Sequence, residues 1–238
     1  MTQVSARWED PRTVSGFASG TPNAQLLAFA QQVLRRGSAS AEPPRCLDIG
    51  CGAARNAVAL VRAGFQVDGT DLTEPMIAAA RRRAALEVPG APIDFALAPM
   101  TALPFPADTF DLVVAHGVWN LARSGAEFRA GVAEAARVAR RGAGLFLCTF
   151  SRHTLPPDAP PDPFESFVFS SWNGEPQCFL TEDQLRTELA SAGLVADRDG
   201  PFTEYNRPAP GQMSAGGPVI YEATFIRRSP SDVGGESS

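Results

Sequence analysis

The residues best placed to do chemistry lie in one short stretch, RCLDIGCGAARN, which spans residues 45–56. Asp48 sits in an apolar run that Gly50 and Gly52 break before helix-forming sequence resumes, which is the pattern of a strand, a glycine turn and a helix. Glycine lets the backbone approach a ligand closely because it has no Cβ and tolerates positive φ. The turn also places a ligand at the positive end of the following helix.

A second acid, Asp71, stands nineteen residues after Gly52, just beyond a second apolar strand at 65–69. An acid at such a strand end can accept hydrogen bonds from a ribose. The turn and Asp71 together predict a pocket for a nucleoside cofactor. A dinucleotide fingerprint would need a third glycine where Arg55 stands, and arginine is too large for the close helix-to-strand packing that this glycine serves. NAD is therefore disfavoured.

The stretch resembles the first motif of the class I S-adenosylmethionine (SAM) methyltransferases, in which an acid and a glycine precede G-x-G. The resemblance assigns Asp48 to the methionine end of SAM, directly or through water. It assigns the turn, Gly50, Cys51 and Gly52, to close backbone contact with the cofactor. Asp71 matches the acid that binds both ribose hydroxyls, and Leu72 beside it joins the expected cofactor-binding residues.

A second motif, APMTALPFPADTFDL at residues 98–112, carries the same resemblance. Relatives with its Leu-Pro-Phe and Phe-Asp parts have an acid just before them that bonds the adenine amino group. Here Pro99 stands at the position of that acid. Adenine is therefore expected to rest on the backbone of Met100 and Thr101 and on apolar walls.

His116 directly follows the strand expected at 111–115, at the edge of the sheet where open parallel sheets bind ligands. An imidazole titrates near neutral pH, so His116 is the tentative catalytic residue, a base that takes a proton from the acceptor. The alternative is that this position touches the methionine part of SAM through its backbone, as in relatives, and is also cofactor-binding. His153 is a weaker candidate base. The chain has two histidines and no cluster at ligand spacing, so no metal site is expected.

The elements that must position these residues alternate along the chain. Strands are expected at 46–49, 65–69, 93–97, 111–115, 145–150, 194–197 and 219–226, with helices beginning near Thr21, Ala53, Thr73, Ser124 and Thr181. Such alternation requires a parallel sheet with right-handed crossovers. The last two strands are joined by a loop, so the last can return antiparallel. The fold class is therefore α/β: a doubly wound, mostly parallel seven-stranded sheet with an antiparallel last strand, Rossmann-like as the resemblance implies.

The chain is expected to divide into an N-terminal cap and helix at 1–43, a methyltransferase domain at 44–228 and a disordered tail at 229–238. Trp8 and Phe17 in the cap either cover the cofactor cleft or dock the terminus on the core. A proline-rich insertion at 151–179, with little periodicity, is interpreted as a substrate-binding loop whose aromatic residues wall the acceptor. The alternative is a stiff cover over exposed sheet.

Charge and composition limit the classes of molecule that the chain is expected to bind. A net charge of −5 over 238 residues gives no general attraction to nucleic acid or anionic membrane, and no run approaches the ~20 apolar residues of a membrane span. The four cysteines, Cys46, Cys51, Cys148 and Cys178, form no C-x-x-C pair, so buried free thiols and a reducing, cytoplasmic location are expected. The expected partner is a small-molecule methyl acceptor, bound by a monomer or homodimer.

Three functions follow from this pattern. The first is a SAM-dependent methyltransferase, with SAM as cofactor, that transfers a methyl group to a small molecule by in-line displacement, where positioning can supply ~7–11 kcal/mol. The second is a non-catalytic SAM- or nucleotide-binding protein, which Pro99 keeps open. The third is a nicotinamide-dependent oxidoreductase, against which Arg55 stands.

Overall fold

The computed structural model describes residues 6–37, 42–207 and 217–228. Its helices are η1 (Ala6–Trp8), α1 (Pro11–Ala18), α2 (Ala24–Arg36), α3 (Arg55–Ala63), α4 (Glu74–Glu87), η2 (Trp119–Leu121), α5 (Gly125–Val138), η3 (Arg152–Thr154) and α6 (Glu182–Ser191). Its strands are β1 (Arg45–Ile49), β2 (Gln66–Asp71), β3 (Ile93–Leu97), β4 (Phe110–His116), β5 (Ala139–Phe150), β6 (Val168–Phe169), β7 (Gln177–Cys178), β8 (Leu194–Ala196), β9 (Phe202–Tyr205) and β10 (Ile220–Arg227). The tail expected to be disordered lies outside the described residues.

The main sheet has the order β3-β2-β1-β4-β5-β10-β8. Strands β1 to β5 pair in parallel, whereas β10 runs antiparallel between β5 and β8, which confirms the expected fold class. Strand β9 was missed: it pairs with residues 220–223 of β10, at the end that β8 leaves uncovered. Its four residues lie within a stretch that was expected to be a loop, because so short a strand shows little periodicity.

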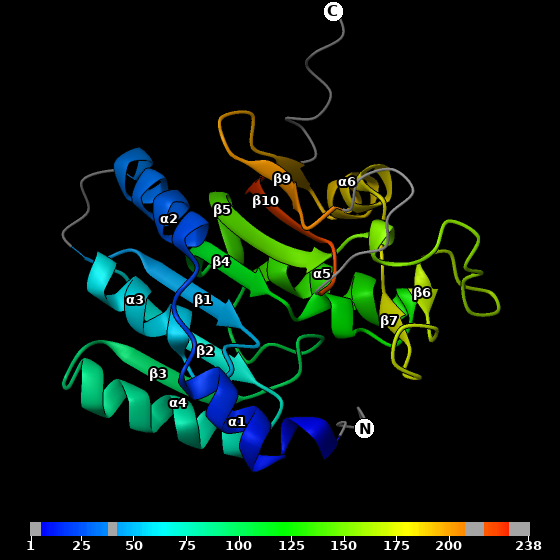
Figure 1. The fold of residues 1–238 in the computed structure, drawn as a ribbon. Helices are drawn as coiled ribbons and strands as arrows, with labels where there is room; N and C mark the ends of the chain where they lie inside the picture. The colour runs from blue at the N-terminus through cyan, green and yellow to red at the C-terminus, as the bar shows by residue number, and fades with distance from the viewer. Residues whose placement is uncertain (1–5, 38–41, 208–216, 229–238) are drawn as a thin grey trace, which may run out of the picture.

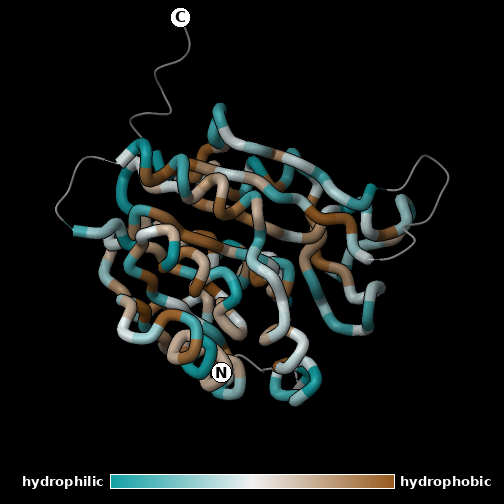
Figure 2. Tube along the Cα trace, turned by 60° about the vertical axis from the view of Figure 1, so that its left-hand side comes forward, coloured by the Kyte–Doolittle hydropathy of each residue, from teal (hydrophilic) through white to brown (hydrophobic). Residues whose placement is uncertain are grey.

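Helices cover both faces of this sheet (Figure 1). On one face, α2, α3 and α4 bury apolar residues such as Phe29, Val58 and Ala80 against the central strands. On the other, α5 and α6 bury Phe128 and Leu185. Figure 2 shows the apolar stretches gathered along the middle of the molecule, with hydrophilic residues toward its outside. Because β1 and β4 run parallel, their carboxyl ends lie at the same edge of the sheet. This edge is on the side where α1 and the β6–β7 hairpin lie (Figure 1).

The insertion at 151–179 is more regular than its sequence indicated. It contains η3 and the β6–β7 hairpin, and its own apolar cluster of Leu155, Phe169 and Phe179 holds it together. Most of the segment is nevertheless irregular, as its low periodicity indicated. The hairpin is stabilised by packing between its aromatic rings, which leaves no periodic pattern in so short a segment.

Several local features also match the sequence. All four cysteines are free and buried, as expected. Helix α6 begins at the expected capping box, in which Thr181 and Gln184 bond to each other's backbone. Among the described residues, no helix is both long and apolar enough to cross a membrane.

Candidate active site

The glycine turn after β1 is built for close approach. Gly50 and Gly52 adopt φ values of +67° and +53°, which side-chain-bearing residues rarely adopt. A Cβ on Gly50 would lie 2.8 Å from Cγ2 of Val118, and one on Gly52 would lie 3.2 Å from Cδ1 of Phe17. Both positions must therefore be glycine for the turn to fit between its neighbours.

Asp71 holds this turn in place from the neighbouring strand. Its Oδ2 accepts a hydrogen bond from the Gly52 amide at 3.0 Å, and its Oδ1 accepts one from the Thr73 amide at 3.1 Å. The Thr73 hydroxyl also donates to Oδ1, and the Thr73 side chain makes no capping hydrogen bond to α4. Burial raises the pKa of Asp71, and these donors oppose the rise. A carboxylate has about four acceptor positions, so Asp71 can still accept a bond from a ligand hydroxyl.

Asp48 lies behind the turn on β1. It is 1% exposed, and its Oδ2 has no hydrogen-bond partner among the described residues. Burial raises its pKa to about 7, although the positive charge of Arg55 opposes the shift. An unpaired buried carboxylate oxygen is costly unless a donor or a cation reaches it.

A cavity opens at the carboxyl edge of the sheet, and most of the expected cofactor-binding residues line it: Gly50, Gly52, Asp71, Leu72, Met100 and His116. Pro99 lines it too. Asp48, Cys51 and Thr101 are not among its lining residues. The Cys51 side chain points back toward the sheet, because a Cβ on Gly69 would lie 3.1 Å from its Sγ.

The N-terminal segment contributes the aromatic part of the lining. Trp8 and Phe17 both line the cavity, and their rings meet edge to face with centroids 5.8 Å apart. Helix α1 contacts α4, yet none of its own residues is buried. This arrangement supports the expectation that the segment covers the cleft over the alternative that it docks into the core.

The aromatic residues of the insertion do not wall the cavity, contrary to expectation. Phe167 packs on Phe128 of α5, with ring centroids 5.4 Å apart, and Phe169 joins the cluster inside the insertion. Phe164 is fully exposed. Phe167 and Phe169 are buried against nearby apolar surface, and only residues 175–177 of the insertion line the cavity.

His116 lies at the end of β4 and lines the cavity, but other residues face both of its ring nitrogens. Its Nε2 is 3.2 Å from Nδ2 of Asn23, and its Nδ1 is 3.4 Å from a guanidinium nitrogen of Arg55. Burial, and then the charge of Arg55, lower its pKa to about 4. The imidazole is therefore neutral at pH 7 and a weak base, which supports the cofactor-contact reading over general-base catalysis.

A polar cluster around His116 escaped the sequence analysis. Three residues in register on β4, β5 and β10 form it: His116, Cys148 and Glu222. Their side-chain atoms that could bind a metal ion lie within 4.8 Å of one another. Asn23, which caps α2, donates its side-chain amide to Glu222 and faces His116. Burial, and then Glu222, raise the pKa of Cys148 to about 12, so the thiol stays protonated at neutral pH. The cluster joins the first turn of α2 to three strands.

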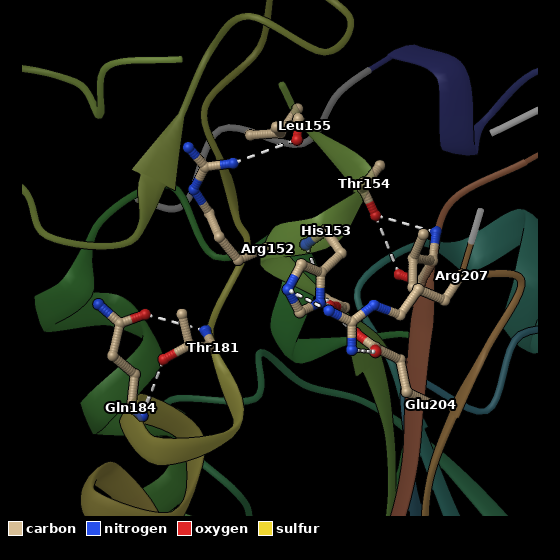
Figure 3. Close-up of polar contacts among 10 residues, drawn as sticks. Arg152, His153, Thr154, Leu155, Thr181, Gln184, Glu204 and Arg207 are labelled. Atoms are coloured by element: carbon tan, nitrogen blue, oxygen red, sulfur yellow. Dashed lines mark hydrogen bonds and ion pairs between the residues drawn. The ribbon is translucent and has the colours of Figure 1, made fainter. Parts of the chain in front are cut away.

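His153 lies in a different polar cluster, away from the cavity lining (Figure 3). Its Nδ1 is 2.6 Å from Oε1 of Glu204, and its Nε2 is 3.3 Å from a guanidinium nitrogen of Arg207. Ser151 also donates to Glu204. These contacts join the start of the insertion to β9. His153 therefore has a structural role at this junction.

The far end of the cavity is built from segments that sequence reasoning did not single out. They are the stretch after β4, the first turn of α5 and the end of the insertion, which provide Leu121, Arg123, Glu127, Glu175, Pro176 and Gln177. Gln177 is only 5% exposed, and its Oε1 has no partner among the described residues. The one sequence feature that pointed toward these residues was the position of the insertion, directly after β5.

Comparison with known proteins agrees with this geometry. Residues 46–142 match a family described as a methyltransferase domain. The demethylmenaquinone methyltransferase of Clavibacter sepedonicus is 32% identical over 159 residues, which cover 65% of this chain and 60% of the relative. The chain thus spans about 60% of the length of the curated relatives it first matches.

Two solved structures share the fold over most of both chains. The Burkholderia thailandensis 1,6-didemethyltoxoflavin-N1-methyltransferase, with 1,6-didemethyltoxoflavin and S-adenosylhomocysteine bound, has a TM-score of 0.65 at 18% identity and covers 94% of this chain and 85% of its own. The cyclase SpnF has a TM-score of 0.64 at 16% identity, with 89% and 85% covered. At these identities the likeness shows the fold alone.

Proposed function

We propose that the chain is a class I SAM-dependent methyltransferase that transfers the methyl group of SAM to a small-molecule acceptor held in the same cavity. The match of residues 46–142 to a methyltransferase domain supports this proposal. The observation that carries the proposal is the turn at Gly50 and Gly52, which Asp71 holds open toward a cavity that continues past His116. Cofactor contacts and an acceptor space thus share one enclosure.

The residues present fit SAM. The glycine turn leaves no room for a side chain at Gly50, and Asp71 keeps acceptor capacity for ribose hydroxyls. The unpaired oxygen of Asp48 is suited to the cationic methionine end. Pro99 and Met100 offer apolar and backbone surface where relatives place an acid for the adenine amino group.

Catalysis here depends on position and on exclusion of water. The sulfonium of SAM supplies an already activated methyl carbon. The protein needs to hold both partners in line, and orientation of this kind contributes ~7–11 kcal/mol in favourable cases. Trp8 and Phe17 cover the cavity and shield the reacting groups from water. His116 lines the cavity, and its neutral imidazole can accept a hydrogen bond at one ring nitrogen, from Asn23 or from Arg55.

Two other functions are alternatives to methyl transfer. Pro99 in place of the adenine-binding acid keeps a SAM-binding protein without turnover as the second candidate. A nicotinamide oxidoreductase is the third. Arg55, at the start of α3, directs its guanidinium to His116 and to the Thr21 carbonyl, and so fills the place where that fingerprint needs glycine.

Calorimetry with SAM, S-adenosylhomocysteine and NADH tests the cofactor, and formation of S-adenosylhomocysteine tests turnover. The acceptor panel should run from demethylmenaquinol, after the named activity of the Clavibacter relative, to polar heterocycles such as the ligand of the Burkholderia structure. We expect SAM to bind, NADH not to bind, and S-adenosylhomocysteine to form only with an acceptor. Binding of SAM without turnover on any acceptor would favour the second candidate, and binding of NADH alone would favour the third.

A further inference from the structure

One polar group at the far end of the cavity lacks a partner. Gln177 lines the cavity and is 95% buried, and its Oε1 accepts no hydrogen bond from any described residue. A buried amide oxygen left without a donor costs free energy comparable to a lost hydrogen bond. Such a group at the wall of a ligand cavity indicates a ligand that brings the missing donor.

The backbone holds Gln177 firmly. Its strand β7 pairs with β6, and the register sets Gln177 opposite Phe169. On the next residue, the buried Cys178 thiol donates to the Ala122 carbonyl, and one residue further the Phe179 amide donates to Phe167. The hairpin is thus fixed to the segment before α5 and to its own partner strand. The backbone of Gln177 is therefore held in place before any ligand arrives.

The charged neighbours of Gln177 are already engaged. Oε2 of Glu127 accepts a hydrogen bond from the Arg123 amide at 2.8 Å, at the start of α5. Arg123 and Glu175 have polar partners of their own. Gln177 is therefore the group at this end of the cavity whose acceptor oxygen still needs a donor, within the part of the chain that the structure describes.

We propose that this end of the cavity is the subsite for the methyl acceptor, and that Gln177 selects acceptors by taking a hydrogen bond from their O–H or N–H group. The inference rests on the proposed function and specifies its substrate class. The acceptor is a small molecule with an apolar or aromatic body, which fits beside Leu121 and Pro176, and with a hydrogen-bond donor at its distal end. Gln177 acts by positioning this molecule.

Matched pairs of compounds test the subsite directly. Phenol with anisole, and aniline with N,N-dimethylaniline, share one ring, and in the second member of each pair methyl groups replace the hydrogen-bond donors. Their affinities for the full chain are measured by ligand-observed NMR, with and without S-adenosylhomocysteine. We expect the donor member of each pair to bind about threefold to tenfold more tightly than its methylated partner, the range that one neutral hydrogen bond provides.

Two variants attribute that preference to one side chain. Gln177→Met keeps the length of the side chain and removes its acceptor oxygen, so the preference for donors should vanish. Gln32→Met is the matched control, because Gln32 also has a buried, unpartnered Oε1 but lies on α2 and does not line the cavity. It should leave the preference as in the wild type.

The outcomes separate this proposal from the proposed function. Equal affinities within each pair, no binding by either member, or a preference that survives Gln177→Met would overturn the subsite, whether or not S-adenosylhomocysteine binds. Failure of SAM and S-adenosylhomocysteine to bind would instead sink the methyltransferase proposal. Once an acceptor is known, Gln177→Met should raise its KM more than it lowers kcat.

Discussion

The two ends of the cavity share one sheet edge but are assembled in different ways. The cofactor end depends on Gly50 and Gly52, in the turn after β1, and on Asp71, the last residue of the adjacent strand β2, whose carboxylate accepts a hydrogen bond from the Gly52 amide. The acceptor end combines residues 121–127 with residues 175–177, which are far apart in the chain. Backbone conformation sets the first end, whereas side-chain packing of an insertion sets the second.

This difference implies different sensitivities to mutation. A region held by positive φ angles and close backbone contacts tolerates little change at a few positions. A region held by packing tolerates more, and its selectivity depends on single unpaired groups such as Gln177. Changes at the cofactor end should therefore abolish binding, while changes toward the acceptor end should alter preference.

The largest effect is expected from Gly50→Val. The new Cβ would stand 2.8 Å from Cγ2 of Val118 in a backbone conformation at φ +67° that valine rarely adopts. We expect SAM affinity to fall more than ~100-fold, which corresponds to more than ~2.7 kcal/mol. Calorimetry measures the affinity, and circular dichroism checks that the chain is folded.

Gly90→Val is the matched control for this change. Gly90 also has positive φ, at +75°, but no described atom lies within 4 Å of the place its Cβ would take, and it does not line the cavity. It should share the backbone strain and keep SAM binding. An equal loss of SAM affinity in both variants would mean that general destabilisation, and not the turn, explains the result.

A smaller loss is expected from Asp71→Ala. The change removes the acceptor of the Gly52 and Thr73 amides as well as the expected ribose contact. Hydrogen bonds to a charged group are worth ~1.5–3 kcal/mol, so SAM affinity should fall about 10- to 150-fold. Asp94→Ala, on exposed β3 and away from this cavity, is the control. SAM affinity within twofold of wild type in Asp71→Ala would refute the pocket assignment.

Asp48 should make SAM binding depend on pH. In the free protein its pKa is about 7, so the carboxyl is largely protonated at pH 6 and ionised at pH 8. A bound cationic group favours the ionised form, so binding at low pH must release a proton. SAM affinity should therefore rise about tenfold from pH 6 to pH 8, as the ionised fraction does.

Asp48→Asn should flatten this dependence. Calorimetry in buffers of different ionisation enthalpy counts the released proton directly. A wild-type affinity that stays constant, or that falls, from pH 6 to pH 8 would mean that Asp48 does not meet a cation of the cofactor.

The smallest effect is expected at His116, where the two ends meet. Its pKa of about 4 keeps the imidazole neutral from pH 8 down to about pH 5, so it should produce no inflection of kcat/KM near the ordinary value of 6.5. His116→Ala should lower turnover less than about tenfold, below the 10²–10⁴ that a general base contributes. A hundredfold fall in turnover with SAM affinity unchanged would restore His116 as the catalytic base.

Local sequence was sufficient for much of the cofactor end. The glycines at 50 and 52 adopt the positive φ that their residue type favours, and β3 has the bounds that its pattern indicated. The antiparallel last strand also followed from a loop where a helix would otherwise connect two strands. These features depend on φ/ψ preference, periodicity and connection length, which are written in neighbouring residues.

Tertiary structure decided the rest. The row of His116, Cys148 and Glu222 exists only because three strands pair in one register, and β9 forms only because β10 offers it an edge. Packing buried Phe169 and Phe179 inside the insertion and left Gln177 in the cavity lining without a donor to its Oε1. Register and packing join residues through contacts that no local pattern encodes, so sequence alone determined the cofactor turn and tertiary structure determined the acceptor end.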